Sequence, residues 1–407
     1  MGKKLRKIKV SKFWKNIFKN RPLMILVAVF ILAMIFSNKS VQNYLLIPSQ
    51  AADTGIVPPG ITDNSTNIFT PNIKFGPIIQ LTGQLGFPPD GSYNFPASDE
   101  WTQSIYGDWL VFKWDPSIGN PEDQQYMLYN LKTKEIRQLT NDGTLKIDVP
   151  RIWGKYVTWV GDDRNLYLYN IGTGVKSQLT IDHKVLIHSE FSVDIKNDRI
   201  VFVREEVPWE EYTMNIIDLS QGNIPVKLFT KDFVITSPVI DGSIIAWRDT
   251  RHAIEITDCE IYAYNMDSGV EFPVSTELHN RTNMSASGGN IIWIDLFNNP
   301  YSSTLFKYNL ASQQGGKVNL TNASWIGQPY ISNGYIVYIG AMDVNFTNPK
   351  LYMYEISTGK ETRIIDADIV APVIFMDKYP VIAWGKYSGS SQNLYMVKGS
   401  YFSQGLF

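Results

Sequence analysis

Residues 154–180 read Gly-Lys-Tyr-Val-Thr-Trp-Val-Gly-Asp-Asp-Arg-Asn-Leu-Tyr-Leu-Tyr-Asn-Ile-Gly-Thr-Gly-Val-Lys-Ser-Gln-Leu-Thr, and the architecture of the chain can be inferred from this unit. Its β-branched and aromatic runs at residues 156–160 and 166–171 predict two strands, because such side chains suit a pleated, half-buried surface. Residues 176–180 predict a third strand. The glycines of Gly172-Thr173-Gly174 permit the tight turn before it. A unit this small cannot bury both faces of its sheet alone, so it must pack against others.

The same unit recurs along the chain at a spacing of about 40–48 residues, which is the period of a four-stranded propeller blade. In each copy an apolar strand follows the leading turn, and the next strand ends in tyrosine in most copies. The repetition predicts an all-β fold, a seven-bladed β-propeller of four-stranded antiparallel blades over residues 76–407. The first of these two strands begins at Trp109, Tyr156, Arg199, Ile244, Ile291, Tyr335 and Val381.

The full repeat consists of an apolar strand, Asp-x-x-Arg or Asp-x-Arg, Leu-Tyr-x-Tyr-Asn, Thr-Gly and x-Gln-Leu-Thr. This pattern resembles the TolB-like, WD-repeat-like β-propellers. The run Asp249-Thr250-Arg251, followed by Glu260 to Asn265, is similar to the cell-surface members found in prokaryotes. The resemblance covers about Gly76 to Val397 and implies the propeller fold. It does not imply one activity, because propellers host unrelated functions.

The seventh unit lacks a clear last strand. The run Pro77-Ile-Ile-Gln-Leu-Thr82 is similar to the last strands that end in Gln138-Leu-Thr140 and Gln178-Leu-Thr180. We expect it to complete the C-terminal blade, because closure removes the exposed edges of an open ring. The alternative is that Tyr401 to Leu406 supplies the missing strand.

The N-terminal region predicts a membrane anchor. Residues 1–37 carry nine Lys or Arg residues and no acidic residue, and Leu23 to Phe36 is an unbroken apolar run. Pro22 and Ser37 extend this run toward the about 20 residues of a full span, and the basic side should stay in the cytoplasm. A cleaved signal peptide is the alternative. We expect a basic cytoplasmic segment (1–21), a transmembrane signal anchor (22–37), an extracytoplasmic linker rich in Asn, Ser, Thr, Pro and Gly (38–75), and the propeller (76–407).

Composition limits the classes of function. Residues 38–407 contain 28 of the 37 basic residues and all 39 acidic residues, so their net charge is −11. A negative net charge disfavours nucleic acid as a partner, because binding of phosphate groups requires a basic surface. The single cysteine, Cys259, excludes a disulfide within the chain. Of the four histidines, only His183 and His188 approach the spacing of metal ligands. No Gly-x-Ser-x-Gly or His-Glu-x-x-His motif occurs. The sequence therefore predicts no catalytic residue, no metal and no cofactor.

The loops predict where a partner binds. With the strands of a blade named a to d outward, the a–b and c–d turns are short, whereas the b–c and d–a loops are long and differ from one another. Because function concentrates on long, divergent loops, we expect a protein or glycan partner on this loop face. Acids follow the b strands, and aromatic residues lie in the loops. The predicted binding residues are Trp114, Asp115, Asp162, Glu205, Trp209, Asp249, Arg251, Asp295, Tyr301 and Asp343.

Two interpretations of these residues stay open. The acids could form polar contacts or a cation site at the channel mouth, or close their own loops through hydrogen bonds and ion pairs with Arg164 and Arg251. Trp209 and Tyr301 could contact a partner or pack their own loops. The expected function is a membrane-anchored binding or scaffolding module at the cell surface. A polysaccharide lyase or hydrolase, and a structural component of the envelope, are the alternatives.

Asn-x-Ser/Thr sequons follow the anchor and are compatible with an exported glycoprotein. Besides Asn38, the candidate glycosylation sites are Asn64, Asn280, Asn283, Asn319, Asn322 and Asn345.

Overall fold

The structure is a computed structural model, and its described residues belong to one unit, Phe69–Phe407. The expected cytoplasmic segment and anchor lie outside the described residues. Within those residues no helix has the length and hydropathy that crossing a membrane requires. The described residues are 73–81, 104–114, 124–143, 146, 148–187, 192–254, 257–296, 302–341, 349–366, 369–388 and 391–401.

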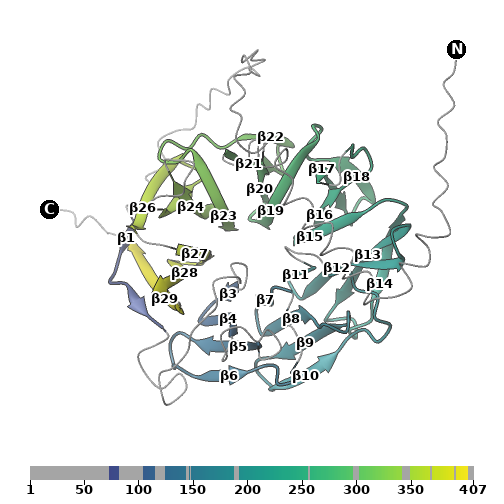
Figure 1. The fold of residues 1–407 in the computed structure, drawn as a ribbon, viewed down its shortest axis with the longest axis horizontal. Coiled ribbons are helices and arrows are strands. Elements are labelled where there is room, and N and C mark those ends of the chain that lie inside the picture. The colour runs from purple at the N-terminus through teal and green to yellow at the C-terminus, as the bar shows by residue number, and fades with distance from the viewer. Residues whose placement is uncertain are drawn as a thin grey trace, which may run out of the picture. The chain divides into compact units, whose positions relative to one another are not determined.

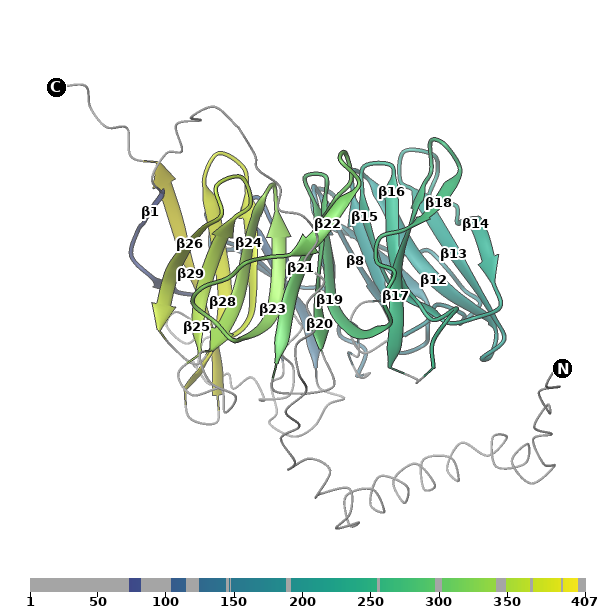
Figure 2. The ribbon, with the colours of Figure 1, turned by 90° about the horizontal axis from the view of Figure 1, so that it is seen from above.

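The described elements are β-strands in antiparallel sheets, which follow one another in chain order around a central axis (Figure 1). Seen from the side, the strands run between two faces that carry the connections (Figure 2). The first three sheets contain β3 (Ser104–Tyr106), β4 (Trp109–Trp114), β5 (Gln125–Asn130) and β6 (Ile136–Gln138); β7 (Arg151–Trp153), β8 (Tyr156–Val160), β9 (Leu166–Asn170) and β10 (Val175–Gln178); and β11 (Val193–Lys196), β12 (Arg199–Val207), β13 (Glu211–Asp218) and β14 (Val226–Lys231).

Next comes an eight-stranded sheet that comprises two successive sets of four strands. The sets are joined where β17 pairs with β19. A four-stranded sheet and a five-stranded sheet complete the circle. The eight strands are β15 (Ile235–Asp241), β16 (Ile244–Asp249), β17 (Asp258–Asn265), β18 (Val270–Pro273), β19 (His279–Ser287), β20 (Asn290–Leu296), β21 (Ser303–Asn309) and β22 (Gln314–Lys317). The remaining strands are β23 (Trp325–Ser332), β24 (Tyr335–Ala341), β25 (Lys350–Glu355), β26 (Lys360–Asp366), β27 (Ile369–Met376), β28 (Pro380–Ser388), β29 (Ser391–Tyr401), β1 (Ile73–Phe75) and β2 (Ile79–Gln80).

The recurring aromatic residues form cross-strand pairs in the interior of the sheets. Trp159 of β8 lies opposite Tyr167 of β9, and their rings stack with centroids 5.8 Å apart. Stacked pairs of this kind stabilise a sheet beyond the area that they bury. The same pair of positions is aromatic in later sheets, which explains why the sequence repeats these residues. The later pairs are Trp247–Tyr262, Trp293–Phe306, Tyr338–Tyr352 and Trp384–Tyr395.

The Gln-Leu-Thr motif ends the outer strand and holds its end against the neighbouring strand. In the second sheet the Leu179 amide donates to the Leu166 carbonyl at 2.7 Å, and the Thr180 hydroxyl accepts from the Leu166 amide at 2.9 Å. The hydroxyl thus satisfies a backbone donor that the outer strand no longer reaches. Leu139 and Thr140 make the same two bonds to Tyr126.

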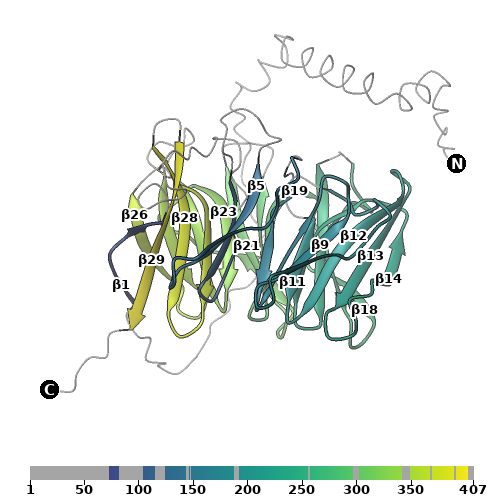
Figure 3. The same ribbon diagram turned by 90° about the horizontal axis from the view of Figure 1, so that it is seen from below.

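The predicted closure of the ring by the N-terminal strand is confirmed. β2 pairs with β29, where Ile79 lies opposite Met396. The Leu81 amide donates to the Leu394 carbonyl at 2.7 Å, the bond that Leu139 and Leu179 make in their own sheets. Residues 73–75, which the sequence analysis placed in the linker, form β1 and extend the pairing along β29, beside which β1 lies in Figure 3. The last sheet therefore takes its outer strands from the start of the folded unit.

Adjacent sheets are connected along their inner strands by hydrogen bonds from backbone amides to side chains. In each case the donor belongs to the next sheet or set in the chain, so every bond crosses a boundary. The donor–acceptor pairs are Ile152 to Ser104, Ile240 to Asp194, Gly289 to Asp241, Asn333 to Ser287 and Met376 to Ser332.

Asp148 makes a similar connection and is expected to give the fold a specific pH dependence. Its carboxylate accepts hydrogen bonds from the amides of Val160 and Ser192, at 3.0 and 3.1 Å. Burial raises the pKa of Asp148 to about 6 from 3.8, and the two amides oppose the rise. The folded state therefore binds a proton that the unfolded state releases, so this contribution to stability falls as pH rises from about 4 to 6.

Urea unfolding of the wild type and of Asp148→Asn between pH 4 and pH 7 tests this expectation. The variant cannot titrate at this position, so the difference between the two free energies of unfolding should change by about 2 kcal/mol across that range. A constant difference would show that Asp148 has the same pKa in both states.

Candidate functional site

A pocket of about 720 Å³ lies between the β11–β14 sheet and the β15–β18 strands. Eight of its eleven lining residues lie in five connections, all of the b–c or d–a kind, so the pocket is on the loop face. The other three, Glu205, Tyr212 and Thr236, lie in the strands next to these connections. The volume falls within the range of about 300–1,000 Å³ that is typical of ligand sites. The lining residues are Arg164, Leu186, Ile187, Glu205, Trp209, Tyr212, Val234, Thr236, Thr250, Ala253 and Ile254.

An ion pair between Arg164 and Glu205 organises one side of the pocket. Arg164 Nη2 lies 2.9 Å from Glu205 Oε2, and Arg164 Nε donates to the Val185 carbonyl at 3.1 Å. Glu205 is the less exposed partner, at 12% of its side chain against 36% for Arg164. The pair joins the β8–β9 loop to the β12–β13 hairpin and so fixes two walls of the pocket.

Trp209 projects from the tip of the β12–β13 hairpin. Its backbone has a φ of +64°, a region that bulky residues rarely occupy, and 76% of the residue is exposed. Its amide donates to Glu205 Oε1 at 3.2 Å, which holds the turn in this conformation. Tyr212 lies behind it and is buried, and burial together with the charge of Glu205 raises the pKa of the Tyr212 hydroxyl.

The opposite wall comes from the β16–β17 loop. The Thr250 hydroxyl donates to the Val234 carbonyl at 3.0 Å, and the Ala253 amide donates to the Thr250 carbonyl at 3.0 Å, so a hydrogen-bonded turn shapes this wall. Ile254 follows the turn with 86% of its surface exposed. Trp209 and Ile254 are thus large apolar side chains on opposite loops of one pocket.

The structure corrects the assignment of Asp249 and Asp295 to a binding surface. Asp249 is fully buried and accepts hydrogen bonds from Trp247 Nε1 and from the Arg251 guanidinium, each at 2.8 Å. Asp295 is 2% exposed and accepts from Trp293 Nε1 and Arg281 Nε. Burial raises the pKa of Asp295, and Arg281 opposes the rise. These carboxylates are satisfied inside the protein, as the loop-closing interpretation predicted.

The other predicted residues are dispersed. Glu205 and Trp209 line the pocket, whereas Asp162 is exposed outside its lining and Trp114 is half-buried against the core of the first sheet. Arg251 stacks on the Tyr262 ring at 3.6 Å and pairs with Asp249 and Glu271. Asp115, Tyr301 and Asp343 lie outside the described residues. Within the described ranges no group of three or more His, Cys, Asp or Glu residues could hold a metal.

The sequence analysis missed the aliphatic half of the pocket. Leu186 and Ile187 precede β11, Val234 precedes β15, and Ile254 lies in the loop between β16 and β17. These positions are distant in the chain and meet only because the blades are adjacent. Ile254 carried a signal that could have been noticed, because it is a large aliphatic residue in a loop between two strands.

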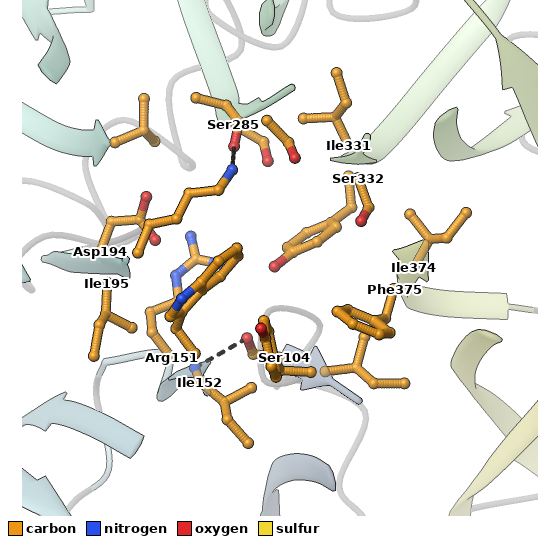
Figure 4. Close-up of a pocket in the computed structure, with 18 residues that line it drawn as sticks. Ser104, Arg151, Ile152, Asp194, Ile195, Ser285, Ile331, Ser332, Ile374 and Phe375 are labelled. Carbon is orange, nitrogen blue, oxygen red and sulfur yellow. Dashed lines mark hydrogen bonds between the residues drawn. The ribbon is translucent and has the colours of Figure 1, made fainter. Parts of the chain in front are cut away.

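A second, smaller cavity lies on the central axis, where the inner strands meet (Figure 4). Its volume is about 50 Å³, and Ser104, Arg151 and Asp194 reach it from three different sheets. Burial raises the pKa of Asp194, and the nearby Arg151 opposes the rise. Tyr106 packs against Trp153 and Phe375 at centroid distances of 4.6 and 4.8 Å, so a cluster of three aromatic rings forms part of the wall of this cavity. The cavity is too small for a ligand larger than one or two water molecules.

The candidate glycosylation sites differ in their exposure in the structure. Asn283 is 5% exposed within β19, so a glycan there is incompatible with the folded sheet, which corrects that assignment. Asn280 is partly buried in the same strand, whereas Asn319 and Asn322 are exposed. Asn64 and Asn345 lie outside the described residues.

Comparison with known proteins gives similarity in structure alone, since no protein-family model and no curated protein matches the chain. An oligogalacturonate lyase in complex with manganese has a TM-score of 0.56 at 15% identity, over 82% of this chain and 97% of that one. The β-propeller domain of the Trilobed protease from Pyrococcus furiosus has a TM-score of 0.54 at 15% identity, over 76% and 95%. TolB from Acinetobacter baumannii has a TM-score of 0.40 at 11% identity, over 73% and 78%.

At these identities the similarity concerns the fold. Three observations lead to one conclusion about the fold: the antiparallel sheets in chain order, the closure by an N-terminal strand, and the similarity to the lyase and to the protease domain. The described part of this chain has the β-propeller fold that its repeats predict.

Proposed function

We propose that this protein is a membrane-anchored, extracytoplasmic binding module, whose seven-bladed propeller captures a protein or glycan partner on its loop face. The blade count follows from treating the eight-stranded sheet as two blades and the five-stranded sheet as one. The observation that carries the proposal is the 720 Å³ pocket with exposed Trp209 and Ile254 on opposite walls. Exposed apolar side chains of this size around a preformed pocket are typical of interaction sites.

Replacing Trp209 by alanine is expected to weaken capture of the partner at least about tenfold, because large aromatic anchors carry much of the binding energy at such sites. A screen of glycans and envelope proteins with the full chain in detergent would supply the partner, and calorimetry the affinities. Val270→Ala is the matched control, because Val270 is 54% exposed at a c–d turn on the other face. If the Trp209→Ala variant bound the partner with wild-type affinity and the control variant bound it more weakly, binding would be on the short-turn face, the face that carries the a–b and c–d turns.

The topology gives a separate prediction. The basic N-terminus should lie inside the cell and residues from Asn38 onward outside, since the basic flank of an anchor stays in the cytoplasm. Protease added to intact cells should release a fragment that contains nearly all of the propeller. An intact, protected chain would contradict the proposed location.

A polysaccharide-active enzyme is the second candidate, favoured by the structural similarity to an oligogalacturonate lyase. Incubation of the protein with oligogalacturonate and Mn²⁺ would test it through the ultraviolet absorbance of unsaturated products. Sustained turnover would replace the binding proposal with the enzymatic one.

A further inference from the structure

We infer that the pocket beside Trp209 takes an apolar side chain of a polypeptide partner, in a segment where Lys or Arg residues flank that side chain. This inference rests on the proposed function and names the class of partner for the same site.

The lining favours an apolar guest over a sugar. Most of its side chains are aliphatic or aromatic, and three of its polar side chains, Arg164, Glu205 and Thr250, already have partners within the protein. Arg164 and Glu205 form an ion pair, and the Thr250 hydroxyl donates to a backbone carbonyl. A sugar brings many hydroxyl groups that need hydrogen-bond partners, and burying them without partners is unfavourable. The apolar lining residues are Leu186, Ile187, Trp209, Tyr212, Val234, Ala253 and Ile254.

The charge around the pocket favours a basic partner. The β12–β13 hairpin carries Glu205, Glu206, Glu210 and Glu211. The first two form ion pairs with neighbouring basic residues, and no ion pair joins Glu210 or Glu211 to another residue in the described ranges. Glu210 is exposed and directly follows Trp209. These two acids have no ion pair in the described ranges and are adjacent in sequence to the lining residues Trp209 and Tyr212. Negative charges at this position attract Lys or Arg and repel an anionic glycan such as oligogalacturonate.

The position of Trp209 suits a recognition residue. A positive φ at tryptophan is strained, and such strain persists only where surrounding contacts impose it. Here Glu205 accepts the Trp209 amide through one oxygen and pairs with Arg164 through the other. The indole is therefore presented to solvent before any partner arrives, which reduces the ordering that binding requires.

The experiment is a selection of short random peptides displayed on phage against the full chain in detergent, after subtraction on the Trp209→Ala variant. Enriched sequences should place an aromatic or aliphatic residue next to Lys or Arg. The synthetic peptide of the most enriched sequence should bind the Trp209→Ala variant at least about tenfold more weakly than the wild type. Enrichment of acidic sequences, or no Trp209-dependent sequence, would overturn the inference.

Charge variants test the electrostatic part. The double variant Glu210→Gln, Glu211→Gln should bind the same peptide several-fold more weakly at low ionic strength, and added salt should reduce the difference. The matched control is Asp198→Asn, Asp267→Asn, which removes two exposed acids from turns on the other face. Equal effects of the two pairs would overturn the inference, because the attraction would then be a property of net charge alone.

A parallel glycan array separates the two proposals. Trp209-dependent capture of a glycan, without any peptide, would retain the loop-face binding function and overturn the polypeptide inference. If substitutions on the short-turn face alone abolished binding of peptides and of glycans, both the loop-face binding function and the polypeptide inference would be overturned.

Discussion

Replacing Asp295 by alanine is expected to lower the free energy of unfolding by about 3–5 kcal/mol, because it leaves a buried guanidinium without its counter-charge. The side chains of Arg281 and Asp295 are 3% and 2% exposed, and their charged atoms lie 2.9 Å apart. Asp295 also accepts the Trp293 indole N–H at 2.8 Å. The pair connects β19 to β20, and Arg281 Nη1 donates to the Cys259 carbonyl of β17. Loss of the Asp295 carboxylate should therefore weaken the junction between the β15–β18 strands and the β19–β22 strands.

Urea denaturation of the wild type and the variant measures this effect. Glu135→Ala is the matched control, because the Arg137–Glu135 pair is similarly short at 2.7 Å but is 28% and 46% exposed. An exposed pair should contribute less than about 1 kcal/mol. Replacing both buried partners, as in Arg281→Met with Asp295→Leu, should recover much of the lost stability. A similar loss in Asp295→Ala and Glu135→Ala would show that burial gives the first pair no special importance.

A chain that begins at Gly83 is expected to be less stable than one that begins at Phe69 by about 4 kcal/mol or more. The shorter chain lacks β1, β2 and Leu81. Leu81 is 7% exposed in the core of the first and last sheets, and its amide bonds to Leu394. Their removal exposes apolar surface and leaves the whole outer edge of β29 without a partner.

Thermal unfolding of three chains, beginning at Phe69, Gly76 and Gly83, separates the contributions of the two strands. The chain that begins at Gly76 keeps β2 and Leu81 and should lose only the smaller part that comes from β1. The chain that begins at Gly83 should melt about 10 °C or more below the longest one. Equal melting temperatures for the Gly76 and Gly83 chains would reject closure by the N-terminal strand.

The strands could be predicted from the sequence because each repeat places the same residue types at the same spacing. β8 spans Tyr156–Val160, as its β-branched run predicts. β2 was found through the similarity of residues 77–82 to the ends of other outer strands. β1 was not predicted, because Ile73–Phe75 is short and follows a segment rich in Asn, Thr and Pro, where nothing local distinguishes a strand.

The site was only partly predictable, for a physical reason. The sequence shows that Asp249 and Asp295 follow apolar strands, but not that each accepts the indole N–H of the tryptophan two residues earlier and is buried by it. Trp209 was predicted because it is a large aromatic residue in a segment, Glu205 to Glu211, that the sequence suggests is a long loop. The structure corrects the loop, because β12 and β13 extend to Val207 and from Glu211, so that Trp209 lies in a tight turn. Ile187 and Ile254 were not, because a pocket between blades depends on side-chain positions that no local pattern specifies.

The pairing of β2 with β29 also governs when this protein can fold during synthesis. Residues 79–80 are made among the first of the folded unit, and their partner strand at residues 391–401 is made last. Until the ribosome has released the C-terminal strand, both edges of the growing ring remain open to pairing with other chains. The closing step joins two ends of the unit that are distant in sequence and is therefore slow relative to formation of each hairpin. Nascent chains of this protein thus carry unpaired sheet edges for almost the whole of the synthesis of the folded unit.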